Sequence, residues 1–114
     1  MADVGSGYIR ASAGQAIRVT YRVRRSTSAA YHVVFDSSST APVRTFTAGD
    51  VGDASDSFRL GRGVFEFDWS VLALAKAASV VVQIEVDDVV RYRREKDYSG
   101  SGVTPWGTVT FKMT

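Results

Sequence analysis

Apolar and polar side chains alternate along most of the chain. In residues 15–24 the apolar positions are Ile17, Val19, Tyr21 and Val23, and the residues between them are arginine or threonine. Successive side chains of a β-strand point to opposite faces. This segment therefore predicts a strand with one buried face and one strongly basic, solvent-facing side.

Residues 79–94 contain two further alternating segments, separated by Asp87 and Asp88. Aspartate breaks strands and tolerates turns, so we expect a β-hairpin here. A two-residue turn at the aspartates would place Arg91 opposite Ile84 and carry arginines onto the apolar face, because a one-residue shift flips every side chain. We therefore expect a longer loop with an odd number of residues, or a β-bulge.

With such a loop or bulge, the apolar side chains of both strands stay on one face of the hairpin. It also places a charge pair across the two strands on the solvent-facing side, and such a pair stabilises a sheet by about 0.2–1 kcal/mol. The β-branched Val89 resists the positive φ that a three-residue loop usually needs, so the shortest odd loop is disfavoured. The expected cross-strand pairs are Val86 with Val90, Ile84 with Tyr92, and Glu85 with Arg91.

Turn residues separate the alternating segments at intervals of roughly ten residues. This pattern predicts an all-β protein: a single domain, residues 1–114, folded as an antiparallel β-sandwich or jelly roll of about seven to nine short strands. Residues 1–7 are expected to form a flexible tail. Residues 71–78, rich in alanine, fit one or two turns of helix, and continued strand is the open alternative. The remaining expected strands are 8–12, 31–36, 43–48, 58–60, 64–70 and 107–113.

The 114 residues contain no evident secretory signal or membrane span. The first residues, MADVGSG, lack a basic flank followed by an apolar stretch, and no apolar run approaches the ~20 residues of a membrane helix. Cysteine is absent, which excludes disulfides and cysteine-ligated zinc. We expect a soluble cytoplasmic protein, or one released without a signal peptide.

The net charge of +2 is too close to balance for a dedicated nucleic-acid-binding protein, so nucleic acid is not an expected partner. Eleven of the 14 basic residues are arginine, which favours fixed, bidentate ion pairs. The basic side of residues 15–24 has two interpretations. Its arginines pair with carboxylates on neighbouring strands, or they form a stripe that binds an anion or a partner.

The sequence offers little for catalysis, and we expect no enzyme activity. No G-x-S-x-G motif is present, and His32 is the only histidine, with no partner that the sequence places beside it. Glu66 and Glu85 are candidates for a glycosidase carboxylate pair, but each is also explained as an outward-facing strand residue. For His32 a structural or exposed role is the simpler interpretation.

Residues 49–57 are the most acidic segment, and we expect them to form a loop. Asp50, Asp53 and Asp56 recur at every third residue, whereas an EF-hand needs carboxylates on alternate residues, a glycine at its sixth position and a glutamate at its twelfth. The segment therefore predicts turn-forming aspartates. Calcium held by these three residues with help from other loops is the alternative, and no other cofactor is expected.

Two non-enzymatic functions fit this architecture. The first is protein–protein recognition or self-assembly into a homo-oligomer through an arginine- and tyrosine-rich sheet face or an edge strand, because such residues are enriched at binding hot spots and unpaired edges recruit neighbours. The alternative is a lectin-like carbohydrate-binding domain, with or without calcium, that uses loop aromatics and acidic residues. The candidate residues are Arg18, Arg22, Arg24, Arg91, Arg93 and Tyr98 for a protein partner, and Trp106, Tyr98, Asp50, Asp53 and Asp56 for a glycan.

Overall fold

The structure is a computed structural model that describes residues 3–24, 28–39, 41–49, 53–73, 79–96 and 105–114. These residues form nine β-strands in two packed sheets, and no helix occurs among them. The predicted all-β sandwich is confirmed. Within the described part of the chain, no helix has the length and apolar character needed to cross a membrane.

The strands are between four and eleven residues long. In chain order they are β1 (Tyr8–Ala11), β2 (Ala16–Arg24), β3 (Ser28–Asp36), β4 (Pro42–Gly49), β5 (Asp53–Arg59), β6 (Gly63–Ala73), β7 (Ser79–Val86), β8 (Val89–Lys96) and β9 (Trp106–Met113).

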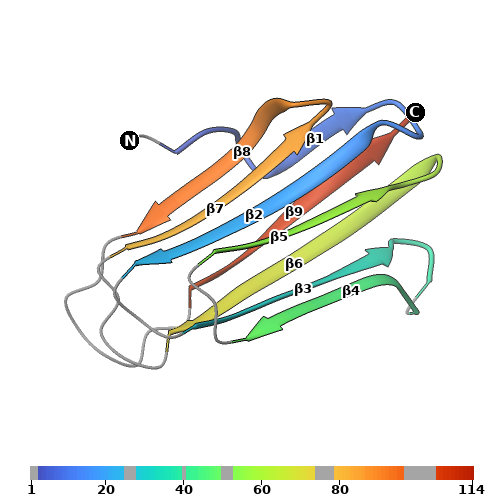
Figure 1. Cartoon of the computed structure of the whole chain (residues 1–114). Helices are drawn as coiled ribbons and strands as arrows, with labels where there is room; N and C mark the ends of the chain where they lie inside the picture. The colour runs from blue at the N-terminus through green and yellow to red at the C-terminus, as the bar shows by residue number, and fades with distance from the viewer. Residues whose placement is uncertain (1–2, 25–27, 40, 50–52, 74–78, 97–104) are drawn as a thin grey trace.

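The strands divide into a five-stranded sheet, ordered β1-β9-β6-β3-β4, and a four-stranded sheet, ordered β5-β2-β7-β8 (Figure 1). Neighbouring strands are antiparallel except β1, which runs parallel to β9. Only β3–β4 and β7–β8 are neighbours both in sequence and in a sheet; every other connection crosses from one sheet to the other. Each sheet face therefore combines residues that are far apart in the sequence.

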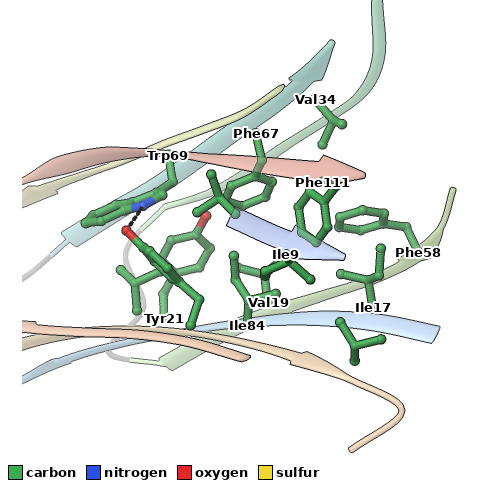
Figure 2. Packing of buried hydrophobic residues seen from close by; sticks show 14 of the residues in the cluster. Ile9, Ile17, Val19, Tyr21, Val34, Phe58, Phe67, Trp69, Ile84 and Phe111 are labelled. Carbon is green, nitrogen blue, oxygen red and sulfur yellow. Dashed lines mark hydrogen bonds between the residues drawn. The ribbon is translucent and has the colours of Figure 1, made fainter. Parts of the chain in front are cut away.

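The inward-facing side chains of both sheets form one continuous core (Figure 2). Ile17, Val19 and Ile84 are fully buried, as the alternation predicted. Burial of each such side chain stabilises the fold by about 1.5–3 kcal/mol. Within the core, Nε1 of Trp69 donates to the hydroxyl of Tyr92 at 3.1 Å, so both polar groups are satisfied without water.

The β7–β8 hairpin closes with a two-residue turn, which the alternation argued against. Val86 pairs with Val89, and Asp87 and Asp88 between them have positive φ values of 46° and 66°. Positive φ at both central residues is the type I′ geometry, which matches the twist of a hairpin. The expected longer loop is therefore wrong.

A β-bulge next to this turn restores the faces of the two strands. Glu85 pairs with Val90 and Ile84 with Tyr92, so Arg91 is the extra residue. The expected bulge and the expected Ile84–Tyr92 pair are confirmed. Two expected pairs are wrong, because the bulge takes up the shift after the turn: Val86 with Val90, and Glu85 with Arg91.

Residues 3–5, expected to belong to a flexible tail, are hydrogen-bonded along the outer edge of β8. Val4 exchanges two backbone hydrogen bonds with Arg93, at 3.0 and 2.9 Å. Gly5 lies so close to the backbone of Arg91 that a Cβ would sit 2.2 Å from its carbonyl oxygen, which favours glycine there. The chain then enters β1 in the other sheet, so this segment joins the two sheets along one side of the sandwich.

Two further segments differ from expectation. β6 extends to Ala73, so the described part of residues 71–78 continues the strand and is not helical, and the rest lies outside the described residues. β5 begins at Asp53, so much of the acidic segment expected to be a loop is strand. Asp56 occupies an inward position of that strand, and a charged residue in a core position hides the alternation.

Candidate functional site

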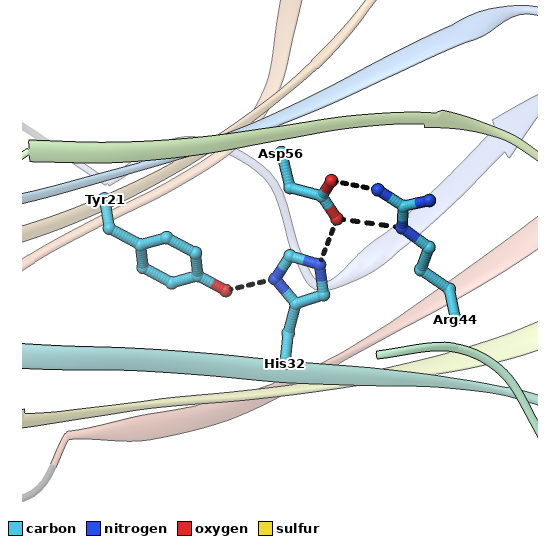
Figure 3. Close-up of polar contacts among 4 residues, drawn as sticks. All are labelled: Tyr21, His32, Arg44 and Asp56. Atoms are coloured by element: carbon cyan, nitrogen blue, oxygen red, sulfur yellow. Dashed lines mark hydrogen bonds and ion pairs between the residues drawn. The ribbon is translucent and has the colours of Figure 1, made fainter. Parts of the chain in front are cut away.

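Four polar side chains form a hydrogen-bonded chain through the core (Figure 3). The hydroxyl of Tyr21 on β2 lies 2.7 Å from Nδ1 of His32 on β3, and Nε2 of His32 lies 2.8 Å from Oδ2 of Asp56 on β5. Arg44 on β4 donates from Nε to Oδ2 of Asp56 at 3.1 Å, and from Nη2 to Oδ1. Because β2 and β5 belong to one sheet and β3 and β4 to the other, the chain ties the two sheets together.

Burial decides the protonation of this chain. His32 is fully buried, which lowers the pKa of its imidazole despite the opposing effect of Asp56, so the ring is neutral at pH 7. With Asp56 ionised, Nε2 of His32 carries the proton and donates to the carboxylate, which leaves Nδ1 to accept from Tyr21. Burial also raises the pKa of Tyr21, so its hydroxyl remains a donor.

Asp56 stays ionised although it is buried. Burial acts to raise the pKa of its carboxyl group, but hydrogen bonds from Arg44 and His32 outweigh burial and hold the pKa below its ordinary value. The side chain of Arg44 is 41% exposed, whereas that of Asp56 is 5% exposed. The ion pair therefore leads from the core to the surface, and the buried charge has the partners that a carboxylate in a core requires.

The order Tyr–His–Asp has the hydrogen-bond pattern of a catalytic triad, but its surroundings do not suit catalysis. A triad needs a nucleophile that substrate can reach, whereas Tyr21 and His32 are both buried. The imidazole is also packed between aromatic rings, with centroids 4.9 Å from Phe46 and 4.8 Å from Phe67. These side chains therefore link the two sheets within the core, and of the structural or exposed role expected for His32 the structural one holds.

The outer face of the four-stranded sheet carries the basic side of β2. Arg18 pairs with Glu85 on β7 at 2.7 Å, and Arg24 pairs with Asp53 on β5 at 3.0 Å. The interpretation that these arginines pair with carboxylates on neighbouring strands is confirmed for both. Arg22 is exposed and has no hydrogen-bond or ion-pair partner in the part of the chain that the structure describes.

The other predicted arginines do not all share this face. Arg93 lines a shallow cavity of 380 Å³ together with Arg18 and Arg22 of β2, and it pairs with Glu95 at 3.1 Å. Arg91, the bulge residue, instead donates to the backbone carbonyl of Arg10 in the other sheet. Tyr98 lies outside the described residues.

The aspartates considered for calcium are not brought together. Asp53 and Asp56 lie on opposite faces of β5: the side chain of Asp53 is 59% exposed and pairs with Arg24, while Asp56 faces the core and pairs with Arg44. Asp50 lies outside the described residues. In the described ranges, no group of three or more His, Cys, Asp or Glu side chains is placed to hold a metal ion.

The outer face of the five-stranded sheet holds two exposed aromatic side chains. Trp106 on β9 is opposite Ser70 on β6, and Ser70 is opposite Tyr31 on β3, so the three side chains share one face. Two strand spacings, about 10 Å, separate the strands that carry the rings. Trp106 is 74% exposed and Tyr31 is 43% exposed, so neither ring is needed to fill the core.

A shallow cavity of 390 Å³ lies at these two rings, and carboxyl groups also line it. Thr108 donates from its hydroxyl to Oδ1 of Asp68 at 3.0 Å. The pKa of Glu66 is raised by hydrogen bonding to Asp68 and by the like charge of that residue. The cavity combines aromatic rings, carboxyl groups and hydroxyls, and no cationic side chain occurs among its described lining residues.

Tyr31 and Asp68 were not predicted as binding residues. Both stand at outward positions of alternating segments, Asp68 between Phe67 and Trp69, and Tyr31 next to the buried His32. An aromatic residue at an outward strand position is the signal that marks Tyr31, because such a position is ordinarily polar.

No family model matches this sequence, and no curated protein sequence matches it. Among solved structures, a domain of unknown function, DUF4425, from Bacteroides vulgatus has a similar fold, with a TM-score of 0.52. The two sequences are 12% identical, and the match covers 89% of this chain and 98% of that chain. At this identity the similarity shows the fold alone.

Proposed function

We propose that this protein is a non-enzymatic carbohydrate-binding domain that holds a glycan on the outer face of its five-stranded sheet. The observation that carries the proposal is the exposure of Trp106 and Tyr31 on either side of Ser70, in one cavity with the carboxyl groups of Glu66 and Asp68. Of the residues that the sequence offered for a glycan and that the structure describes, Trp106 alone lines this cavity.

The chemistry of the cavity suits a sugar. A pyranose ring has an apolar C–H face that packs on an aromatic ring, and its hydroxyl groups donate to carboxylates and exchange hydrogen bonds with hydroxyls. Trp106 and Tyr31 supply the ring faces, while Asp68, Ser70 and Thr108 supply the hydrogen-bonding groups. The spacing of two strands between the rings favours an oligosaccharide over a monosaccharide, because one sugar cannot stack on both.

The charge of the lining limits which glycans fit. Glu66 and Asp68 are the charged residues among the described lining of the cavity, and both are acidic. Like charges repel, so uronic acids, sialic acids and sulfated sugars are disfavoured, and neutral or amino sugars are favoured.

A glycan array, followed by titration of the best neutral oligosaccharide, tests the proposal. We expect Trp106→Ala and Tyr31→Ala each to weaken binding at least ~10-fold, which corresponds to about 1.4 kcal/mol. Tyr8→Ala is the control, because Tyr8 is exposed on the same sheet and does not line the cavity. Its affinity should stay within about twofold of the wild-type value.

Two results would reject the proposal: no binding to any glycan on the array, or equal affinity of the wild type and Trp106→Ala. The array should be run with calcium and again with a chelator. Binding through the sheet face is expected to be the same in both. Binding that is lost with chelator would instead favour a calcium-assisted site away from this sheet face.

Self-association through an edge strand is a second candidate. β4 pairs only with β3, and its residues are mostly exposed. Val43 and Thr45, which flank Arg44 on β4, carry no charge that would prevent another strand from pairing here. Light scattering over a wide concentration range should then show a dimer that Thr45→Lys dissociates. A monomer at every concentration would reject this candidate. Binding of a protein partner to the arginine-rich face of the four-stranded sheet stays a prediction.

A further inference from the structure

A cleft opens along the side of the sandwich where β4 and β5 are edge strands of different sheets. Its volume is 450 Å³, within the range of roughly 300–1,000 Å³ that is usual for small-molecule sites. Apolar side chains from both sheets form its walls, and two arginines lie among them. These lining residues are Val43, Phe58, Leu60 and Phe65, with Arg44 and Arg59.

The charge of this cleft differs from that of the other cavities described. The two charged residues among its described lining are both arginine, whereas carboxyl groups line the cavities at Arg18, at the β7–β8 turn and at Trp106. Asp56 neutralises Arg44 from the core side. Arg59 also lines the cavity at the β7–β8 turn, together with Asp87 and Asp88, whereas no carboxyl group occurs among the described lining residues of the cleft itself.

Both arginines have hydrogen-bond donors to spare. Arg44 uses Nε and Nη2 on Asp56, and Arg59 uses Nη1 on the carbonyl of Gly14. Toward the described residues, Nη1 of Arg44 and Nη2 of Arg59 make no hydrogen bond. The guanidinium carbon of Arg44 also lies 5.6 Å from the ring centre of Phe58, so it sits against an apolar wall of the cleft.

We propose that this cleft binds a small amphipathic carboxylate, a molecule with an apolar chain or ring and one carboxylate group. Guanidinium groups bind carboxylates through paired, charge-assisted hydrogen bonds. The carboxylate lies at Arg59 and the free edge of Arg44, and the apolar part lies against Phe58, Leu60 and Phe65. The site is separate from the sheet face that carries Trp106 and does not depend on glycan binding.

Titration of the isotope-labelled full chain with octanoate, octanol and acetate tests this proposal by NMR. We expect octanoate to give saturable shifts centred on the amides of residues 58–61. Octanol has the same chain without the charge and should bind at least ~10-fold more weakly. Acetate has the charge without the chain and should give no saturable shift at the same concentrations. Added salt should weaken octanoate binding, because the contact is ionic.

Variants at Arg59 and Arg62 test whether octanoate binds in the cleft or responds only to the net charge of the protein. Arg59→Gln should weaken octanoate at least ~5-fold, while Arg62→Gln should not, since Arg62 is exposed in the β5–β6 turn and does not line the cleft. Arg59→Lys keeps the charge but offers no paired donors, so its octanoate affinity should lie between those of the wild type and Arg59→Gln. Arg44 is the poorer test, because its removal leaves Asp56 without its main partner.

Four outcomes with the wild type, Arg59→Gln and Arg62→Gln would overturn the proposal. They are octanol binding as tightly as octanoate, equal effects of Arg59→Gln and Arg62→Gln, shifts centred away from the cleft, and the absence of any saturable shift with octanoate. If Arg59→Gln shifts amide signals throughout the protein, its fold has changed, and Arg59→Lys is then the variant that tests the site. A folded Arg59→Lys protein that has lost octanoate binding would also contradict the proposal.

Discussion

Nε2 of His32 lies 2.8 Å from Oδ2 of Asp56, and this contact joins the five-stranded sheet to the four-stranded sheet inside the core. Both residues occupy inward strand positions, which are ordinarily apolar. A buried polar pair constrains how two sheets are aligned, because any slip leaves the imidazole and the carboxylate without partners. The alignment of the two sheets therefore depends on this pair.

The first prediction is that the free energy of unfolding falls as the pH drops below about 6.5. Burial lowers the pKa of His32 from its ordinary 6.5, so just below that pH the unfolded chain binds more protons than the folded one, and acid favours unfolding. The slope is at most about 1.4 kcal/mol per pH unit for this one group. A second loss is expected below pH 3.8, because the pKa of Asp56 is held under that value. Urea unfolding between pH 3 and 8 measures both.

His32→Gln is the control for the first loss, because His32 is the only histidine in the chain. Glutamine keeps an N–H donor for Asp56 but does not titrate. The variant should be less stable than the wild type at pH 7, and its stability should change little between pH 5 and 7. A wild-type curve that is already flat over this interval would mean that the imidazole is not held neutral.

The second prediction concerns Asp56→Ala, which removes the acceptor shared by His32 and Arg44. Removal of one member of a buried ion pair costs about 3–5 kcal/mol, and the partial exposure of Arg44 should reduce the loss to about 2–3 kcal/mol. Asp53→Ala is the control on the same strand, since its pair with Arg24 is exposed and should contribute no more than about 1 kcal/mol. Equal losses of unfolding free energy in the two variants would contradict a structural role for the chain.

The third prediction concerns the close packing of Gly107 on β9 against the indole of Trp69 on β6. A Cβ on residue 107 would lie 2.6 Å from Nε1 of Trp69, so alanine must push the indole away from the hydroxyl of Tyr92. We expect Gly107→Ala to lose about 1–3 kcal/mol. Gly61→Ala meets open space and should change stability by no more than about 0.5 kcal/mol. In thermal unfolding, Gly107→Ala should have the lower midpoint temperature of the two variants. Equal midpoints would show that Gly107 and Trp69 are not closely packed.

The fourth prediction concerns the turn between β7 and β8. Asp88 has a φ of 66°, which glycine adopts without strain, so Asp88→Gly should stabilise the protein by about 0.5 kcal/mol. Asp87→Gly should instead destabilise it by about 1 kcal/mol, because the Asp87 carboxylate accepts hydrogen bonds from the backbone of Ala16 and the side chain of Gln15. Urea unfolding of both variants checks the opposite signs, and a loss in both would contradict the turn geometry.

The alternation predicted the strands whose inward positions are apolar, as in β2 with Ile17 and β6 with Phe67. It failed at β5, because Asp56 at an inward position made a strand read as an acidic loop. At the β7–β8 hairpin, the turn at Asp87 and Asp88 and the neighbouring bulge shift the register in opposite senses. Their effects cancel on the apolar face, so the pattern alone cannot separate a short turn with a bulge from a longer loop.

The candidate binding face depends on strand order, which the pattern does not contain. Alternation indicates that Tyr31 and Trp106 differ from their buried neighbours, but only the placement of β6 between β3 and β9 brings them to one surface. Strand order also determines which partners the arginines of β2 have. Their positions follow from the sequence, whereas their pairing with Glu85 and Asp53 depends on β7 and β5 lying on either side of β2.

The two tryptophans make the fifth prediction and the most direct test of glycan binding on the sheet face. Trp106 is exposed, while Trp69 is buried and bonded to Tyr92, so their indole N–H signals report the surface and the core separately. We predict that titration with the best neutral oligosaccharide shifts the indole signal of Trp106 saturably and leaves that of Trp69 in place. Saturating oligosaccharide that leaves the Trp106 signal unmoved would contradict binding at this face.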